Sequence, residues 1–322
     1  MRSFFDIGVE EHIDKNGILS KIDALINWRR IEEILGDVHS DLGRTGYDVV
    51  QLFKCLLLQN WHSLSDPGLE DALHVRLDFM VFTGFSIGDK LPDETTFCRF
   101  RNKLTQQKKY EKLLNEINRQ LEQHNLKVKQ ASVAIVDATL IDANARPNTV
   151  YKETETGSLD KEQSKDPDAR WLKKGKKSHF GYQAFSRCDA EGYIDKTHVT
   201  PANLSEQKQL DHMTAGLEKG VRVQTDKGFF SQENKQNLRK KGLKNGLMYR
   251  AYRKKPLTKR MKQFNKLISK TRYRIEQSFG TIKRRFSYQK ASYFTTQKVD
   301  AQFALKAMCL NLLKACNKIQ IA

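Results

Sequence analysis

Three acidic residues stand out because of where they lie in the sequence. Asp137 and Asp226 each follow a short run rich in apolar and β-branched residues. Glu276 is the only acidic residue between positions 234 and 299, a segment with 21 lysines and arginines. A carboxylate weakens the attraction of a basic surface for a polyanion, so an isolated one indicates a specific role. Three carboxylates can hold two hard divalent ions, and oxygen ligands suit Mg²⁺ or Mn²⁺ better than zinc. The pattern predicts metal-dependent chemistry at a phosphate.

Each acid also has a simpler interpretation. Asp137 and Asp226 could cap turns at the ends of strands. Glu276 could form a surface ion pair with Arg272, four residues earlier on the same helical face, or with Lys283, seven residues later. The ordered set of two aspartates and a glutamate, the last in a basic helix, favours the metal site over three separate structural roles.

The chain changes character near residue 131. Helical spacing of apolar residues dominates before it, and short β-branched runs appear after it. We expect a helical N-terminal domain over 1–128 and a mixed α/β sheet flanked by helices over 129–322, with a polar surface loop at 146–178. The expected helices are 21–38, 47–61, 69–82, 94–104, 110–121, 204–217, 268–286 and 301–319, and the expected strands are 132–137, 180–186, 193–200, 221–225 and 247–252.

Two residues beside the acids have expected roles in local geometry. Gly228, two residues after Asp226, suits a tight turn from strand to loop. Asp142 lies five residues after Asp137 and points to the other face of the sheet if the strand continues, so we predict a turn or a supporting role for it.

Composition points to a nucleic acid partner. The chain of 322 residues has a net charge of +19, which favours phosphate contacts whose affinity falls with salt. A basic protein that is ribosome-associated or merely soluble is the alternative. The five cysteines form no metal-binding spacing and predict reduced thiols. No stretch is long and apolar enough for a membrane span, so we expect a cytoplasmic bacterial protein, nucleoid-associated when bound to DNA.

The helix expected at 94–104 is the candidate for reading DNA. Asp93 is a good N-cap for it, and it should expose polar side chains that include Arg99 and Arg101. A helix, a turn and a polar second helix are typical of DNA-binding units. A plain helical packing domain fits the same spacing.

Several motifs in order resemble the DDE transposases of bacterial insertion sequences, near the insertion sequence 5 family. The resemblance extends over nearly the whole chain. Arg272, Glu276 and Lys283 match an R-x3-E-x6-K signature, but Ser269 stands where the fuller signature has a tyrosine. The other matching segments are 91–101, 136–143, 166–171, 180–183, 200–203 and 225–230.

The resemblance implies a ribonuclease H-like catalytic core and two metal ions. In such an enzyme Asp137 would bridge both ions, Asp226 would complete one site and Glu276 the other. The family cleaves DNA at terminal inverted repeats with a metal-activated water and transfers the freed 3′-hydroxyl into target DNA. Its partners would be double-stranded DNA and a second copy of the chain in a synaptic complex.

The remaining basic residues are candidate DNA contacts. Trp171 could stack on a base or anchor packing, and the lysine tract at 173–177 could contact phosphates or be merely solvated. The full set of candidates is Arg272, Lys283, Lys227, Arg284, Arg285, Lys173, Lys174, Lys176, Lys177, Arg99, Arg101 and Trp171. Rival functions are a metal nuclease without strand transfer, a catalytically silent DNA-binding protein, and an RNA-binding protein.

Overall fold

The computed structural model describes residues 14, 16–38, 46–128, 131–147, 151–153, 159–161, 164–253 and 255–319. They form two compact units, one over 1–129 together with 304–322 and one over 130–303. We expected the second domain to continue to the end of the chain. The structure instead places the last segment in the helical unit, where Lys306 donates to the Asn60 carbonyl at 2.7 Å and Asn311 donates to Asn118 at 2.8 Å.

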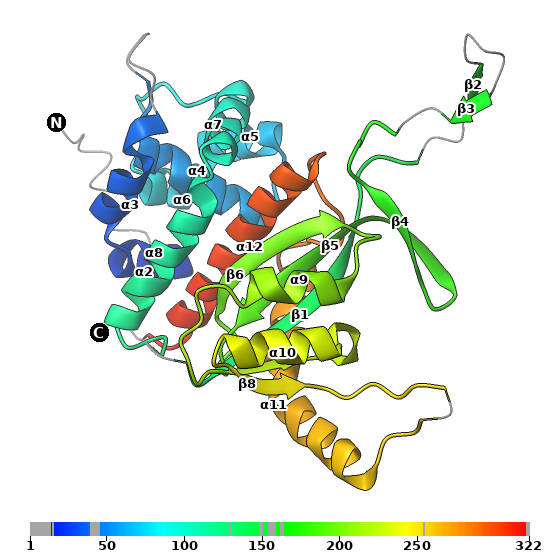
Figure 1. Cartoon of the computed structure of the whole chain (residues 1–322). Helices are drawn as coiled ribbons and strands as arrows, with labels where there is room; N and C mark the ends of the chain where they lie inside the picture. Colours follow the sequence, from blue (N-terminus) through cyan, green and yellow to red (C-terminus); the bar gives the residue numbers. More distant parts are fainter. Residues whose placement is uncertain are drawn as a thin grey trace. The chain divides into compact units, whose positions relative to one another are not determined.

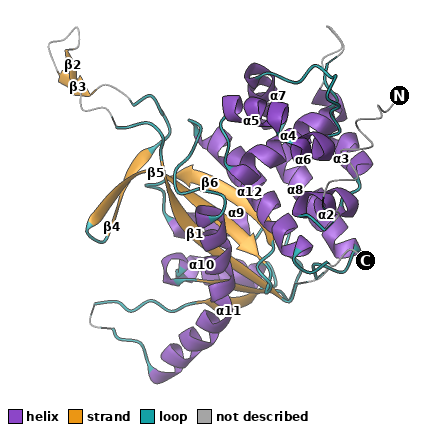
Figure 2. Ribbon diagram, turned by 180° about the vertical axis from the view of Figure 1, so that it is seen from behind, coloured by secondary structure: helices purple, strands orange, loops and turns teal. Residues whose placement is uncertain are grey.

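The helical unit is built from short helices (Figures 1 and 2). Two expected helices are each divided, at Asn27 and at Arg76, where the backbone is extended. The elements are α2 (Ile18–Leu25), α3 (Trp28–Leu35), the 3₁₀ turn η1 (Gly36–Val38), α4 (Val49–His62), α5 (Asp66–Val75), α6 (Leu77–Thr83), α7 (Glu94–Gln106), α8 (Lys109–Gln123) and the part of α12 (Thr296–Cys316) that begins at Ala304.

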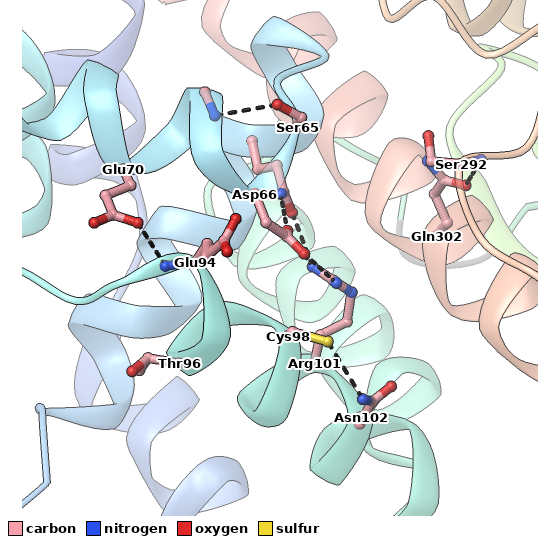
Figure 3. A network of polar contacts seen from close by, with 12 residues as sticks. Ser65, Asp66, Glu70, Glu94, Thr96, Cys98, Arg101, Asn102, Ser292 and Gln302 are labelled. Atoms are coloured by element: carbon pink, nitrogen blue, oxygen red, sulfur yellow. Dashed lines mark hydrogen bonds and ion pairs between the residues drawn. The ribbon is translucent and has the colours of Figure 1, made fainter.

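Capping and a buried ion pair order α7. Asp93 is its N-cap, as predicted, and accepts a hydrogen bond from the Thr96 backbone N–H at 2.7 Å. Figure 3 shows that Arg101, further along α7, points toward Asp66 at the start of α5, and two hydrogen bonds of 2.8 Å join the side chains. The amphipathic face predicted for 110–121 is buried along α8.

The second unit contains a mixed sheet with the order β4-β5-β1-β7-β8, and β6 also pairs with β5. β1 runs parallel to β7, and β7 parallel to β8, while β4, β5 and β6 add antiparallel pairs. Its elements are β1 (Val133–Asp142), β4 (Arg170–Lys174), β5 (Lys177–Cys188), β6 (Ile194–Pro201), α9 (Glu206–Met213), β7 (Arg222–Thr225), the 3₁₀ turn η2 (Lys227–Phe229), α10 (Gln232–Lys240), β8 (Lys244–Leu247), α11 (Lys259–Arg284) and the first part of α12; β2 (Tyr151–Glu153) and β3 (Leu159–Lys161) form a separate pair.

Helices cover both faces of this sheet. Val136, Phe185 and Val223 lie on one face and pack in one core cluster with residues of α9 and α10. Gln224 lies on the other face, since neighbouring residues of a strand alternate, and it bonds to Thr271 of α11. The long helix α11 therefore packs on the face opposite α9 and α10.

Two expectations for this unit were wrong in part. Residues 146–178 were expected to form a loop, but β4 and the start of β5 pair within that range as an antiparallel hairpin. The last strand was expected at 247–252 and lies instead at Lys244–Leu247, where it pairs with β7. No helix in the part of the chain that the structure describes is long and apolar enough to cross a lipid bilayer.

Candidate active site

The register of the parallel strands brings the two aspartates together. Pairing between β1 and β7 ends at Val136 and Thr225, and the next residues along the chain are Asp137 and Asp226. The carboxyl ends of neighbouring parallel strands meet at one edge of a sheet, where ligands bind in open α/β sheets. Two aspartates 89 residues apart in the sequence thus reach the same edge.

Asp137 does not end its strand, contrary to the sequence interpretation. β1 continues to Asp142 beside β5, so Asp137 lies mid-strand and is buried. Burial raises the pKa of Asp137 to about 6, the guanidinium of Arg272 and the Ala138 N–H lower it, and the charges of Asp226 and Glu276 add to the rise. A buried carboxylate among other acids indicates a site that can accept a cation.

Arg272 connects Asp137 to Glu276. Its Nη1 donates to Asp137 Oδ2 at 2.7 Å, and its Nη2 donates to Glu276 Oε1. The ion pair with Glu276 is the one that helical spacing predicted. The second ion pair, to Asp137, joins α11 to β1 and brings the third acid to the same edge of the sheet as the two aspartates.

A fourth acid that sequence reasoning missed lies beside Asp226. The charges of Asp226 and Asp137 act on Glu206, the first residue of α9, and its pKa is raised chiefly by burial and further by those two charges. Gly228 does not have a positive φ, so the turn does not require glycine on that ground. A Cβ at Gly228 would instead overlap with Oε2 of Glu206. The useful sequence signal was this glycine so close to Asp226.

The second half of β1 contains Asp142 and is contacted by Lys283 of α11. Lys283 donates to the Leu140 carbonyl at 2.7 Å, and burial lowers its pKa. Asp142 contacts His179 at 3.1 Å and lies on the sheet face opposite Asp137, as predicted for a strand that continues. The hydrogen bond of Lys283 therefore joins α11 to β1.

The remaining candidate DNA contacts fall into exposed and buried groups. Trp171 is half exposed and packs its ring on Phe180 at 5.4 Å between centroids. Arg101 is only 6% exposed and bonded to Asp66, so the expectation of an exposed contact was wrong for this residue. Its guanidinium is used inside the helical unit. The exposed candidates are Arg99, Lys173, Lys174, Lys176, Lys177, Lys227, Arg284 and Arg285.

The donor chemistry of the site fits a divalent metal. Carboxylate oxygens are the ligands that Mg²⁺ and Mn²⁺ prefer. Burial chiefly raises the pKa of Asp137, and the charges of Asp226 and Glu276 act on it as well. Among the residues that the structure describes, no three acidic, histidine or cysteine side chains lie close enough to hold a metal ion together. Arg272 supplies the positive charge between Asp137 and Glu276 in this arrangement.

Comparison with known proteins identifies the family of the chain. A family model described as "Transposase DDE domain" matches residues 129–312, and one described as "Transposase domain (DUF772)" matches residues 8–103. The chain belongs to the DDE transposase family. The transposase for insertion sequence element IS1106 of Neisseria meningitidis serogroup B is 48% identical over 226 residues, which are 69% of this chain and 78% of that protein. This DDE transposase is accordingly an enzyme that cleaves DNA and transfers strands.

Two solved structures show distant likeness to the transposase. A piggyBac transposase synaptic complex with hairpin DNA has a TM-score of 0.45 and 12% identity, covering 93% of this chain and 72% of that one. The Mos1 strand transfer complex has a TM-score of 0.22 and 11% identity, covering 83% and 86%. Both likenesses are too distant to bear on the site.

The raised pKa of Asp137 makes the stability of the metal-free transposase depend on pH. Folded Asp137 holds its proton more tightly than unfolded Asp137, so its contribution is complete below about pH 4 and is lost as the pH rises through about 6. A rise of the Asp137 pKa from 3.8 to about 6 corresponds to roughly 2 to 3 kcal/mol in the free energy of unfolding. Thermal unfolding in EDTA across this range should show that loss in the wild type and in Asp142→Asn, but not in Asp137→Asn. An equal loss in all three would assign the effect to other groups.

Proposed function

We propose that the chain is an insertion sequence transposase of the insertion sequence 5 family, with a ribonuclease H-like catalytic unit. It would bind terminal inverted repeats, cut the DNA at their boundary and join the freed 3′-hydroxyl to target DNA. The observation that supports this proposal is that Asp137 and Asp226 both follow the end of the β1–β7 pairing, and that the charges of Asp226 and Glu276 act on Asp137. The exposed cations nearby fit a phosphate backbone.

In this proposal the three acids hold two divalent ions, Mg²⁺ or Mn²⁺, and Asp137 is shared between them. When bound, the ions supply a nucleophilic oxygen at neutral pH and stabilise the leaving oxygen in an in-line displacement at phosphorus. Asp226 would give one carboxylate oxygen to this site while its Oδ1 accepts the Gly228 N–H at 2.8 Å. Arg272 would move away from Asp137 and Glu276 toward a DNA phosphate.

The β4–β5 hairpin is the proposed backbone-binding element. It carries Lys173, Lys174, Lys176 and Lys177, all exposed, around a turn with positive φ at Gly175. Trp171 on β4 lies next to this tract and exposes an aromatic surface suited to an unpaired base.

Removing the hairpin charges should weaken DNA binding without regard to sequence. In the triple variant Lys173→Gln, Lys176→Gln and Lys177→Gln, the slope of log affinity against log salt should fall by about 0.9 for each phosphate that the lysines no longer neutralise. Lys112→Gln changes an exposed lysine of α8 and serves as the control. Fluorescence anisotropy with labelled duplex DNA at several salt concentrations measures both. An unchanged slope in the triple variant would contradict phosphate binding at the hairpin.

The function is tested by a reaction with purified protein. Labelled DNA that carries the inverted repeats flanking the gene is incubated with Mg²⁺ or with EDTA. Nicks at the repeat boundary that require Mg²⁺, followed by joined products, are expected. Specific binding without cleavage would show a catalytically silent DNA-binding protein instead, and cleavage without joining would show a nuclease.

The proposed partners follow from the reaction. Two transposon ends must be held together for transfer, so we propose a homodimer in the synaptic complex. The substrate is chromosomal DNA, which places the proposed reaction in the bacterial cytoplasm, at the nucleoid. Sedimentation of the protein with and without repeat DNA tests the dimer.

A further inference from the structure

Glu206 is held in a fixed position at the edge of the sheet where the aspartates meet. It is half-buried at the start of α9, and its Oε1 accepts a hydrogen bond from Gln183 Nε2 at 2.6 Å. Gln183 belongs to β5 and is only 4% exposed. The carboxylate is therefore fixed by a buried side chain of the sheet, unlike an ordinary acid in the first turn of a helix.

Close packing places the other oxygen of Glu206 beside Asp226. Oε2 lies so near the backbone of Gly228 that a Cβ there would overlap with it. The N–H of the same Gly228 donates to Asp226 Oδ1 at 2.8 Å. An oxygen of each carboxylate thus lies within 3.0 Å of the position that a Cβ would take at this one glycine.

An unpaired acceptor lies at the same place. Gln183 Oε1 is buried and has no hydrogen-bond partner in the described part of the chain. The nitrogen of the same amide group bonds to Glu206, so this oxygen belongs to the group that fixes the carboxylate. A buried acceptor without a donor costs about 1 to 3 kcal/mol, and native structures usually provide a partner.

The carboxylates of Glu206 and Asp226 and the amide oxygen of Gln183 would all be stabilised by a nearby cation. Among the described residues Glu206 makes no ion pair, and the nearby charges of Asp226 and Asp137 are both negative. Lys174 is the cation whose charge acts on it, but Lys174 is exposed. An acidic side chain at the start of a helix is stabilised by the helix dipole even when it is exposed. That effect alone therefore does not explain why Glu206 is partly buried and bonded to Gln183.

We propose that Glu206 and the amide oxygen of Gln183 hold a divalent cation together with Asp226. Glu206 is then a fourth carboxylate of the site, on the α9 side of the sheet, opposite Arg272 and Glu276 on α11. Amide and carboxylate oxygens are the ligands that Mg²⁺ and Mn²⁺ take. The inference rests on the function proposed above, because it assigns one of the two ions of that site.

Mn²⁺ binding to the full chain tests the assignment without any DNA reaction. Glu206→Gln keeps the shape of the side chain and an oxygen that can accept from Gln183, but removes the charge. Isothermal titration should show one of two Mn²⁺ ions lost, or bound at least about tenfold more weakly. Glu233→Gln is the matched control, since Glu233 is an exposed acid in the first turn of the neighbouring helix α10. Unchanged stoichiometry and affinity in Glu206→Gln would overturn the proposal.

Two further variants keep the test decisive. The Asp137→Asn variant should also lose Mn²⁺. If Asp137→Asn binds Mn²⁺ as the wild type does, the whole proposed metal site is wrong. If Asp137→Asn loses Mn²⁺ and Glu206→Gln does not, only the role of Glu206 is wrong. If Glu206→Gln does not fold, Glu206→Asp withdraws the carboxylate by one methylene and should weaken the same ion. The stabilisation of melting by Mn²⁺ gives a second measure, and it should be smaller in either Glu206 variant than in the wild type.

Discussion

Replacing Asp137 with asparagine should reduce Mg²⁺-dependent DNA cleavage at least about 100-fold, because even residues one step removed from a metal change activity 10- to 100-fold. The amide cannot carry the negative charge that a shared metal ligand supplies. Asp137 is also bonded to Arg272 and influenced by the charges of both Asp226 and Glu276. Cleavage of labelled repeat DNA in Mg²⁺ measures the effect.

Asp142→Asn is the matched control for that variant. Asp142 is on the same strand, five residues further on and on the opposite face, where it contacts His179. It should keep cleavage within a few-fold of wild type, and both variants should still bind repeat DNA in a mobility shift. Near-normal cleavage by Asp137→Asn would remove this residue from the catalytic set. Asp226→Asn and Glu276→Gln are expected to match Asp137→Asn.

Replacing Arg101 with alanine should lower the free energy of unfolding of the helical unit by about 3 kcal/mol, the lower end of the range for breaking a buried ion pair. Arg101 makes two hydrogen bonds of 2.8 Å to Asp66, and the arginine side chain is 7% exposed against 21% for the aspartate. The substitution leaves the partly buried carboxylate of Asp66, whose pKa Arg101 helps to lower, without its cation. Urea unfolding followed by circular dichroism measures the change.

Arg99→Ala provides the comparison on the same helix. Arg99 is exposed two residues earlier, and substitutions at such positions usually change stability by no more than about 0.5 kcal/mol. If Arg99 contacts phosphate, its variant should instead reduce the salt dependence of DNA binding, which Arg101→Ala should leave unchanged at temperatures where it is folded. A stable Arg101→Ala with altered salt dependence would restore Arg101 as a DNA contact.

Much of the local structure could be predicted because local sequence causes it. The cap of Asp93, the buried face of α8 and the shared helical face of Arg272 and Glu276 depend on residues within one or two turns. The strands β1 and β7 could be predicted from two short apolar runs, each with an aspartate after it. Charge patterning indicated DNA, since the excess of lysine and arginine is visible without a fold.

Other features depended on partners far apart in the sequence. Arg101 and Arg272 were both expected to contact DNA. Arg101 instead bonds to Asp66 inside the helical unit, and Arg272 bonds to Asp137, which is 135 residues away in the sequence. Glu206 belongs to no acidic motif, and only the packing of α9 against the Asp226–Gly228 turn places it at the site. Spacing along a helix or strand predicts which side chains share a face, whereas tertiary packing decides which charge from elsewhere in the chain meets that face, because contact depends on distance in space.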